Sequence, residues 1–154
     1  MIAVLQRVAD ASVVADGVMT GKIGAGLMIL LGVLEGDGRE EALLLAEKIS
    51  KLRIFTDEAD KMNLSVKDIG GGALVVSNFT LAANYAKGNR PDFFAAAHPS
   101  VAEPLYEHFV DLLRERIGRV ATGSFGADMK IRMTADGPVT IVMDSALLKK
   151  GGRA

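Results

Sequence analysis

The longest apolar run of the chain, residues 27–34, most restricts the folds that this sequence can adopt. It reads Leu-Met-Ile-Leu-Leu-Gly-Val-Leu, with glycine-containing turns at residues 24–26 and 35–38. A run of this length cannot cross a bilayer, which needs about 20 apolar residues in a helix. It therefore predicts a strongly buried strand near the centre of a sheet.

The segments around this run predict a mixture of strands and helices. Residues 1–8 form a strand pattern, and Asp16-Gly17 between residues 12–15 and 18–23 predicts a β-hairpin. The apolar spacing predicts helices over residues 39–52 and 100–117, the second with a capping box from Ser100 to Glu103. Further strands are expected at residues 53–55, 74–76, 119–122, 129–134 and 139–143, with loops over 56–63 and 135–138. This order predicts an α+β fold in which two helices cover the sheets.

Composition bounds the domain count and the classes of function. The 154 residues, 49% of them hydrophobic, suffice for one domain with a normal core. The chain has no cysteine, which excludes a thiolate metal site and fits the cytoplasm, and its start lacks the pattern of a signal peptide. A formal net charge of −1 means that any RNA binding must use a local basic patch and shape. We expect one domain over residues 1–145 and a flexible basic tail over residues 146–154.

Polar residues follow the apolar run at residues 74–76 and predict a site there. Ser77, Asn78 and Thr80 stand together directly after this run. Polar groups at the end of a buried strand are held by a rigid scaffold and are open to a ligand. The same pattern also occurs where a strand simply ends in turn residues, so both interpretations stay open at this point.

Two groups of basic and polar residues have alternative interpretations. Arg7 lies inside an apolar strand, where a buried guanidinium would need carboxylate or carbonyl partners; it could equally lie on the surface at the strand end. Lys87, Asn89 and Arg90 follow in a loop, either as solvated residues or as contacts to a phosphate or an RNA end.

Patterns for metal, nucleotide or triad chemistry are weak. His98 and His108 have no second ligand at metal spacing, and the sequence contains no phosphate-binding glycine loop after a strand. We therefore expect no metal and no cofactor. A Ser-His-Asp triad that brings one histidine near Ser77 or Thr80 stays open.

Two short motifs and the segments around them carry a family resemblance. Residues 77–80 read Ser-Asn-Phe-Thr, and residues 135–140 read Ala-Asp-Gly-Pro-Val-Thr. Other matching positions lie within residues 1–8, 20–24, 31–33, 53–55, 61–63, 88–91 and 123–129. By their order and spacing, the chain resembles the D-aminoacyl-tRNA deacylase family, whose motifs read Ser-Gln-Phe-Thr and Asn-X-Gly-Pro-X-Thr. Asn78 and Ala135 depart from that pattern.

The resemblance implies a single α+β domain with barrel-like, mostly antiparallel or mixed sheets that forms a homodimer. In such a dimer, Gly137 and Pro138, joined by a cis bond, enter the pocket of the second subunit, and Arg7 holds their loop. Main-chain atoms of this loop would exclude an L side chain and admit D-aminoacyl groups or glycine. Phe125 and Met129 match positions that line the site of the terminal adenosine, and Arg90 is expected to contact the substrate.

The resemblance also implies an enzyme of translation proofreading that hydrolyses the ester of D-aminoacyl-tRNA, and of glycyl-tRNA mischarged on tRNA for alanine. Ser77, Asn78, Phe79 and Thr80 are the expected catalytic residues. The ester is activated, so the N–H groups of Phe79 and Thr80 could form an oxyanion hole while water attacks, helped by the vicinal ribose hydroxyl. Thr80 as a nucleophile would need a base, and the sequence offers none.

Three other functions stay open: a non-catalytic protein that binds the tRNA end, a serine or threonine hydrolase of small esters, and the relative that removes misplaced L-alanine. Arg7 and Phe79 favour the D-specific branch over the last of these. The expected partners are tRNA and a second copy of the chain, with no membrane.

Overall fold

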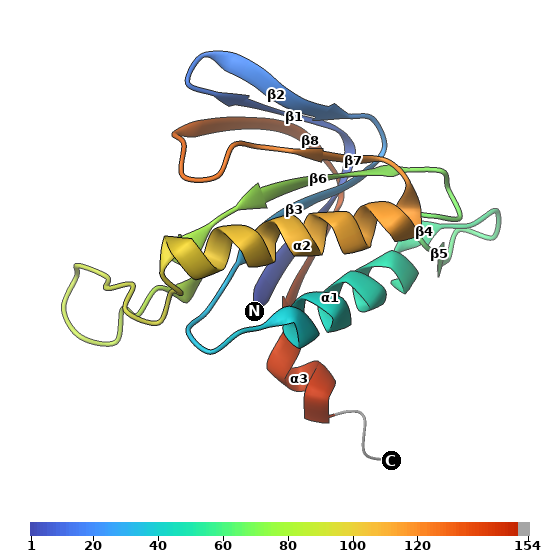
Figure 1. Cartoon of the computed structure of the whole chain (residues 1–154). Coiled ribbons are helices and arrows are strands. Elements are labelled where there is room, and N and C mark those ends of the chain that lie inside the picture. Colours follow the sequence, from blue (N-terminus) through green and yellow to red (C-terminus); the bar gives the residue numbers. More distant parts are fainter. Residues whose placement is uncertain (151–154) are drawn as a thin grey trace.

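A strongly curved mixed sheet forms the body of the structure, a computed structural model that describes residues 1–150 (Figure 1). Its strands are β1 (Ile2–Ala15), β2 (Val18–Ile23), β3 (Gly26–Gly32), β6 (Gly72–Ser77), β7 (Val120–Thr122) and β8 (Met129–Asp144). The order is β2-β1-β3-β6-β7, and β8 pairs with the other edge of β1. The pairs made by β1 are antiparallel, whereas β6 runs parallel to β3 and β7. The predicted mixed sheet and the predicted hairpin at Asp16-Gly17 are both confirmed.

The sheet curls until its two ends meet. β2 and β7 stand at opposite ends of the strand order, yet a Cβ atom added to Gly21 would lie 2.7 Å from the carbonyl oxygen of Thr122. Only glycine allows two backbones to approach this closely. The sheet is therefore nearly closed, and the barrel-like prediction is confirmed.

Two strands are longer than the sequence indicated. Residues 1–8 and 12–15 were predicted as separate strands but form the single strand β1, and residues 129–134 and 139–143 likewise belong to the single strand β8. β1 and β8 pair along their whole length, from Ile2 opposite Asp144 to Ala15 opposite Met129. The predicted loop at residues 135–138 is instead an irregularity within this pair, because residues 136–139 stand opposite the single residue Arg7.

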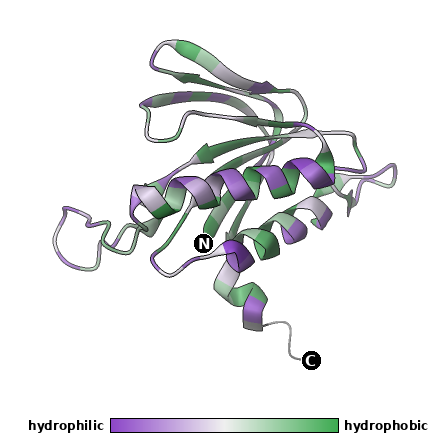
Figure 2. Cartoon of the chain, viewed as in Figure 1, coloured by the Kyte–Doolittle hydropathy of each residue, from purple (hydrophilic) through white to green (hydrophobic). Residues whose placement is uncertain are grey.

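Two long helices cover one face of the sheet, as predicted. α1 (Arg39–Lys51) and α2 (Pro99–Ile117) pack on each other and on the sheet (Figure 1), and hydrophobic and hydrophilic bands alternate along α2 (Figure 2). The core under the helices includes Leu5, Ile29, Leu45, Val75 and Phe109. A second core lies inside the curl of the sheet, formed by Val8, Ala11, Val13, Ile23, Met28, Leu74 and Val76. Within residues 1–150, no helix is long and apolar enough to span a membrane.

Two local predictions need correction. Helix α2 begins one residue before Ser100: His98 is its N-cap, accepting a hydrogen bond from the Ser100 N–H, and Pro99 takes the first position, where its missing N–H costs nothing. Residues 55–64 form a short hairpin of β4 (Phe55–Thr56) and β5 (Met62–Leu64), where the sequence suggested a strand at residues 53–55 and a loop over residues 56–63.

The predicted tail begins as a helix. Residues 146–150 belong to α3 (Ser145–Lys150), whose Lys149 pairs with Glu40 at 3.1 Å and with Glu41 on α1. Leu148 packs against the core under the helices, and this contact anchors α3 to the rest of the fold. The rest of the predicted tail, residues 151–154, lies outside the described residues.

Candidate active site

A cavity of about 850 Å³ opens where strand β6 ends and helix α2 begins. Its lining comes from the end of β3, the end of β6, residues 93–99, the first turns of α2 and the segment before and within β8. Of the predicted site residues, the cavity brings together Ser77, Asn78, Phe79, Phe125 and Met129. This volume lies within the range of pockets that enclose small ligands, and it is large enough for a nucleoside carrying an aminoacyl group.

The turn after β6 is closed by the Asn78 side chain. Asn78 continues the sheet, because its N–H donates to the carbonyl oxygen of Leu31 at 2.8 Å. Its Oδ1 then accepts a hydrogen bond from the Thr80 N–H at 3.1 Å and another from the Thr80 hydroxyl. This is the local turn that a short amide side chain makes with the backbone two residues on, and the short helix η1 (Phe79–Ala82) follows it.

These hydrogen bonds distinguish the two main-chain donors that the sequence suggested. The Thr80 N–H is already engaged by Asn78, whereas the Phe79 N–H makes no hydrogen bond within residues 1–150. The Thr80 hydroxyl donates to an amide oxygen, which cannot act as a strong base. The geometry therefore offers Phe79 N–H as a free donor and gives Thr80 no activating group.

Aromatic rings form two walls of the cavity. Phe79 and Phe93 meet edge to face, with ring centroids 5.1 Å apart, and Tyr106 packs against Phe125 at 5.9 Å. The Tyr106 hydroxyl donates to the Val75 carbonyl oxygen at 2.7 Å, and burial raises the pKa of Tyr106 to about 12. Tyr106 thus stays neutral and fixes the floor of the cavity. Neither Phe93 nor Tyr106 was predicted from the sequence, where the adjacent aromatic pair at residues 93–94 was the available signal.

Arg7 lies away from the cavity and holds the irregular segment of β8. Its side chain is only 11% exposed and donates to the Ile54 carbonyl oxygen at 2.8 Å and to the Asp136 carbonyl oxygen at 3.0 Å. The guanidinium is thus buried among carbonyl groups, one of the two alternatives that the sequence allowed. The Asp136 carboxylate adds an ion pair at 3.5 Å.

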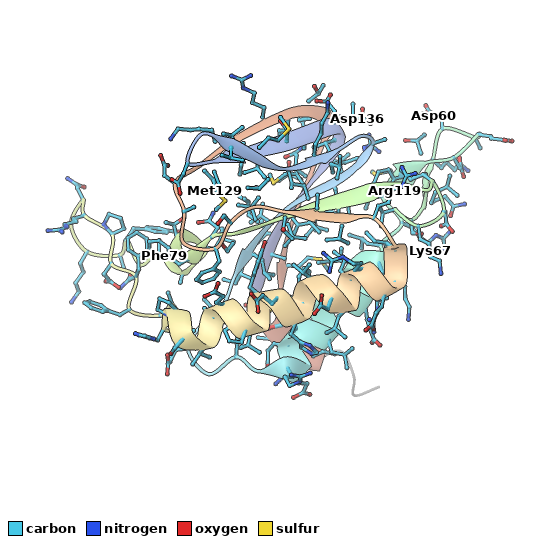
Figure 3. All side chains as sticks on the ribbon, turned by 45° about the horizontal axis from the view of Figure 1, so that its top comes forward. Asp60, Lys67, Phe79, Arg119, Met129 and Asp136 are labelled. Carbon is cyan, nitrogen blue, oxygen red and sulfur yellow. The ribbon has the colours of Figure 1, made fainter. Side chains whose placement is uncertain are left out.

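Gly137 and Pro138 are exposed and do not line the cavity of their own chain. Figure 3 places Phe79 and Met129 toward one end of the sheet and Asp136 toward the other. The Gly137-Pro138 bond is cis. Gly137 has φ +133°, and an added Cβ atom would lie 2.7 Å from the Val139 nitrogen, so no other residue fits there. The structure therefore separates this segment, together with Arg7, from the cavity at Ser77.

The histidines take part in capping and surface contacts. His98 lines the cavity and its Nδ1 lies 2.8 Å from the Ser100 hydroxyl, while His108 lies 3.3 Å from the Arg39 guanidinium. Neither histidine forms a hydrogen bond with Ser77 or Thr80 in the part of the chain that the structure describes. The same part contains no group of three His, Asp or Glu side chains placed to hold a metal ion.

Fold and site together define a class of protein. It is a nearly closed α+β barrel with an aromatic-walled cavity at the end of a strand. Phe79 lines this cavity and its main-chain N–H has no hydrogen-bond partner among the described residues, where the Thr80 hydroxyl contacts an amide oxygen and no base. The family model of D-Tyr-tRNA(Tyr) deacylase matches residues 4–144. The chain belongs to this family, and the predicted family is confirmed.

Individual relatives agree with this assignment. Proteins named D-aminoacyl-tRNA deacylase from Cereibacter sphaeroides and Chloroflexus aurantiacus are 56% and 55% identical, over 94% and 100% of this chain and 100% and 96% of theirs. Because these relatives are named deacylases, the predicted enzyme class, a hydrolase, is confirmed. Among solved structures, the c-Myc DNA unwinding element binding protein superposes with a TM-score of 0.87 at 41% identity, over 94% of this chain and 98% of its own. A probable eukaryotic D-amino acid tRNA deacylase shares the fold, with a TM-score of 0.78 at 21% identity over 93% of this chain and 98% of its own.

Proposed function

We propose that this protein hydrolyses the ester bond between a D-amino acid and the terminal ribose of tRNA. The observation that most supports this proposal is that one cavity is lined by Phe79, whose main-chain N–H has no hydrogen-bond partner among residues 1–150, and by Phe125 and Met129. The names and near-complete coverage of the relatives support the same substrate. In this proposal the adenine packs against Phe125 and Met129, and the ester carbonyl lies near Phe79.

The reaction needs one donor at the carbonyl and one water. Water adds to the carbonyl carbon, and the negative charge that develops on the carbonyl oxygen is stabilised by the Phe79 N–H. The bond to the ribose oxygen then breaks, and that oxygen takes up a proton to leave tRNA and a free amino acid. One well-placed donor of this kind contributes about 3–4 kcal/mol to the transition state. The neighbouring ribose hydroxyl positions the water, so no acidic or basic side chain is required.

We further propose that chirality is read by a second copy of the chain. Gly137 and Pro138 are exposed, and Arg7 holds their segment away from the cavity of the same chain. In a homodimer, the partner's Gly137 and Pro138 would place main-chain atoms next to the α-carbon, where an L side chain would clash. Glycine has no side chain, so glycyl-tRNA mischarged on tRNA for alanine is expected to be hydrolysed too.

The test is release of amino acid from purified D-tyrosyl-tRNA and L-tyrosyl-tRNA, each compared with a reaction without protein. We expect rapid hydrolysis of the D ester only. No hydrolysis of either, with tRNA still bound, would support a non-catalytic tRNA-end protein and refute the proposal. Release of L-alanine from its misplaced tRNA ester, with the D ester spared, would favour the L-alanine editing relative. Hydrolysis of small esters that does not depend on tRNA would indicate a general esterase.

The oligomeric state needs a separate measurement. Sedimentation equilibrium across a concentration series should give twice the monomer mass, and a monomer at assay concentration would refute the shared site. The cytoplasm stays a prediction for its location.

A further inference from the structure

Exposed aromatic rings are concentrated in one segment next to the cavity. The side chains of Phe79, Tyr85 and Phe94 are 60%, 79% and 90% exposed, and within residues 1–150 the other aromatic residues are buried or half-buried. All three exposed rings therefore lie within residues 79–94. A single exposed apolar side chain is ordinary, but exposed aromatic residues gathered in one segment next to a cavity are typical of a binding surface.

The loop that presents two of these rings is braced at its base. Asn84 and Asp92 exchange main-chain hydrogen bonds at 2.9 and 3.0 Å, and the Asn84 side-chain amide donates to the Asp92 carboxylate at 3.1 Å. Residues 85–91 project from this brace, beyond the start of α2 at the left of Figure 1. The exposed rings are thus carried on an anchored loop.

Charge on the same loop points to a phosphate-bearing ligand. Lys87 and Arg90 are exposed, and neither forms an ion pair or side-chain hydrogen bond in the part of the chain that the structure describes. The one carboxylate of the loop, Asp92, is turned into the brace and also accepts the Phe94 N–H at 3.3 Å. Among the residues that the structure describes, Glu35 is the only acidic one that lines the cavity. Rings with free cations between them suit single-stranded nucleic acid, whose bases stack on aromatic faces while its phosphates meet Lys and Arg.

We propose that the braced loop of residues 84–94 binds the single-stranded nucleotides that precede the terminal adenosine of tRNA. Tyr85 and Phe94 stack on these bases, and Lys87 and Arg90 contact their phosphates. Continuity with the cavity supports this occupant, because Phe94 is itself part of the cavity lining and its neighbour Phe93 packs on Phe79. Because Phe94 both lines the cavity and is 90% exposed, a strand whose last nucleoside fills the cavity can pass over this ring on its way out. This inference rests on the proposed function and deepens it, since it assigns the nucleotides outside the catalytic pocket.

The test compares two substrates that differ only in the nucleotides before the ester. One is D-tyrosyl-tRNA and the other is the D-tyrosyl ester of adenosine alone. Tyr85→Ala should raise KM for the tRNA by about fivefold or more, the lower end of what one base stack contributes, and leave hydrolysis of the adenosine ester unchanged. Tyr85→Phe keeps the ring and should behave as wild type. Met62→Ala, which removes a side chain 60% exposed on β5 at the far side of the molecule (Figure 1), is the matched control and should change neither substrate.

Three outcomes would overturn the inference: no change in KM for the tRNA, an equal loss on both substrates, or the same loss in the control variant. If wild type hydrolyses neither substrate, the proposed function fails, and the loop is then tested by binding of uncharged tRNA. In that assay wild type should prefer tRNA with its complete 3′ end over tRNA lacking the last three nucleotides, and Phe94→Ala should reduce this preference. Equal binding of both tRNAs would refute the inference by itself.

Salt dependence tests the phosphate contacts separately. Replacing both Lys87 and Arg90 with Gln removes two predicted contacts, so the slope of log K for tRNA against log salt should become less steep by about 1.4, at about 0.7 for each single-strand contact. An unchanged slope would mean that these cations face solvent in the complex.

Discussion

Replacing Arg7 with Ala tests how one buried side chain supports both the fold and the proposed chiral selection. The Arg7 guanidinium joins two segments that are distant in sequence, the Ile54 carbonyl before β4 and the Asp136 carbonyl in the irregular part of β8. Without it, residues 136–139 lose the side chain that fixes them relative to the body of the sheet. We expect Arg7→Ala to lower both the free energy of unfolding and the preference for D over L esters.

The size of the stability change follows from the two hydrogen bonds. A hydrogen bond from a charged donor contributes about 1.5–3 kcal/mol. The hydrogen bond to the Ile54 carbonyl is partly buried, so its loss costs this full amount. The Asp136 carbonyl is exposed, so water replaces the lost donor and the loss of that bond costs less. The ion pair to the exposed Asp136 carboxylate adds little. The sum is about 2–4 kcal/mol, and Arg7→Lys should recover only part of it because an ammonium lacks the fork that reaches both carbonyls.

Urea unfolding and charged-tRNA hydrolysis measure the two effects. The urea concentration at the midpoint of unfolding should fall, and the dependence of the unfolding free energy on urea concentration should stay unchanged. The ratio of the D-ester to the L-ester hydrolysis rate should fall about tenfold, equivalent to 1.4 kcal/mol of lost discrimination. Arg132→Ala is the matched control, because it removes an exposed arginine from the same strand. A folded Arg7→Ala protein with the D/L ratio of wild type would refute the role of the Arg7 contact in chiral selection.

Four further changes test the site and the fold. Thr80→Ala should lower kcat less than about tenfold, and a loss of several thousandfold would identify a nucleophile. Asn78→Ala should also change kcat only mildly while costing about 1 kcal/mol of stability, the usual value of a lost cap; complete inactivity of the folded variant would contradict this. Tyr106→Phe should cost about 1 kcal/mol in urea unfolding, since the carbonyl that it contacts keeps a second hydrogen bond, and a cost above about 3 kcal/mol would mean that the ring has moved. The hydrogen bond from Lys149 lowers the pKa of Glu41, so its stabilisation is present above pH 4.5 and is lost as pH falls below that value. Glu41→Gln should therefore lose less stability than wild type between pH 6 and pH 3, and equal losses would refute the pair.

Much of the fold could be predicted because its signals are local. The apolar run at residues 27–34 forms the inner strand β3 with neighbours on both sides, and the Asp16-Gly17 turn forms the β1–β2 hairpin. The continuity of β1 and β8 could not be predicted, since each strand contains polar residues that ordinarily end a strand. Those residues are tolerated because the long pairing of β1 with β8 supports them from the other side.

The candidate site likewise contains parts that local sequence predicts and parts that depend on residues distant in sequence. The end of β6 could be located from its polar residues, because a strand end is a local feature. The surroundings of Arg7 could not, since its acceptors lie 47 and 129 residues away in sequence. The aromatic wall was missed for a related reason: Tyr106 lies on a helix and reads as an ordinary core residue until its hydroxyl is seen to reach the Val75 carbonyl.

The departure at Asn78 shows why a motif must be interpreted through its hydrogen bonds. Asn reaches the N–H two residues on because its side chain is short, and Oδ1 here engages both the N–H and the hydroxyl of Thr80. A Gln at this position, as in the motif that the chain resembles, is one methylene longer and does not favour that closed turn. In this chain the Phe79 N–H therefore stays available as a donor, whereas the Thr80 N–H is occupied by the Asn78 side chain. The proposed reaction uses only the Phe79 N–H, and the Asn78 side chain bonds Thr80 and not that donor, which is why Asn78→Ala is expected to change kcat only mildly.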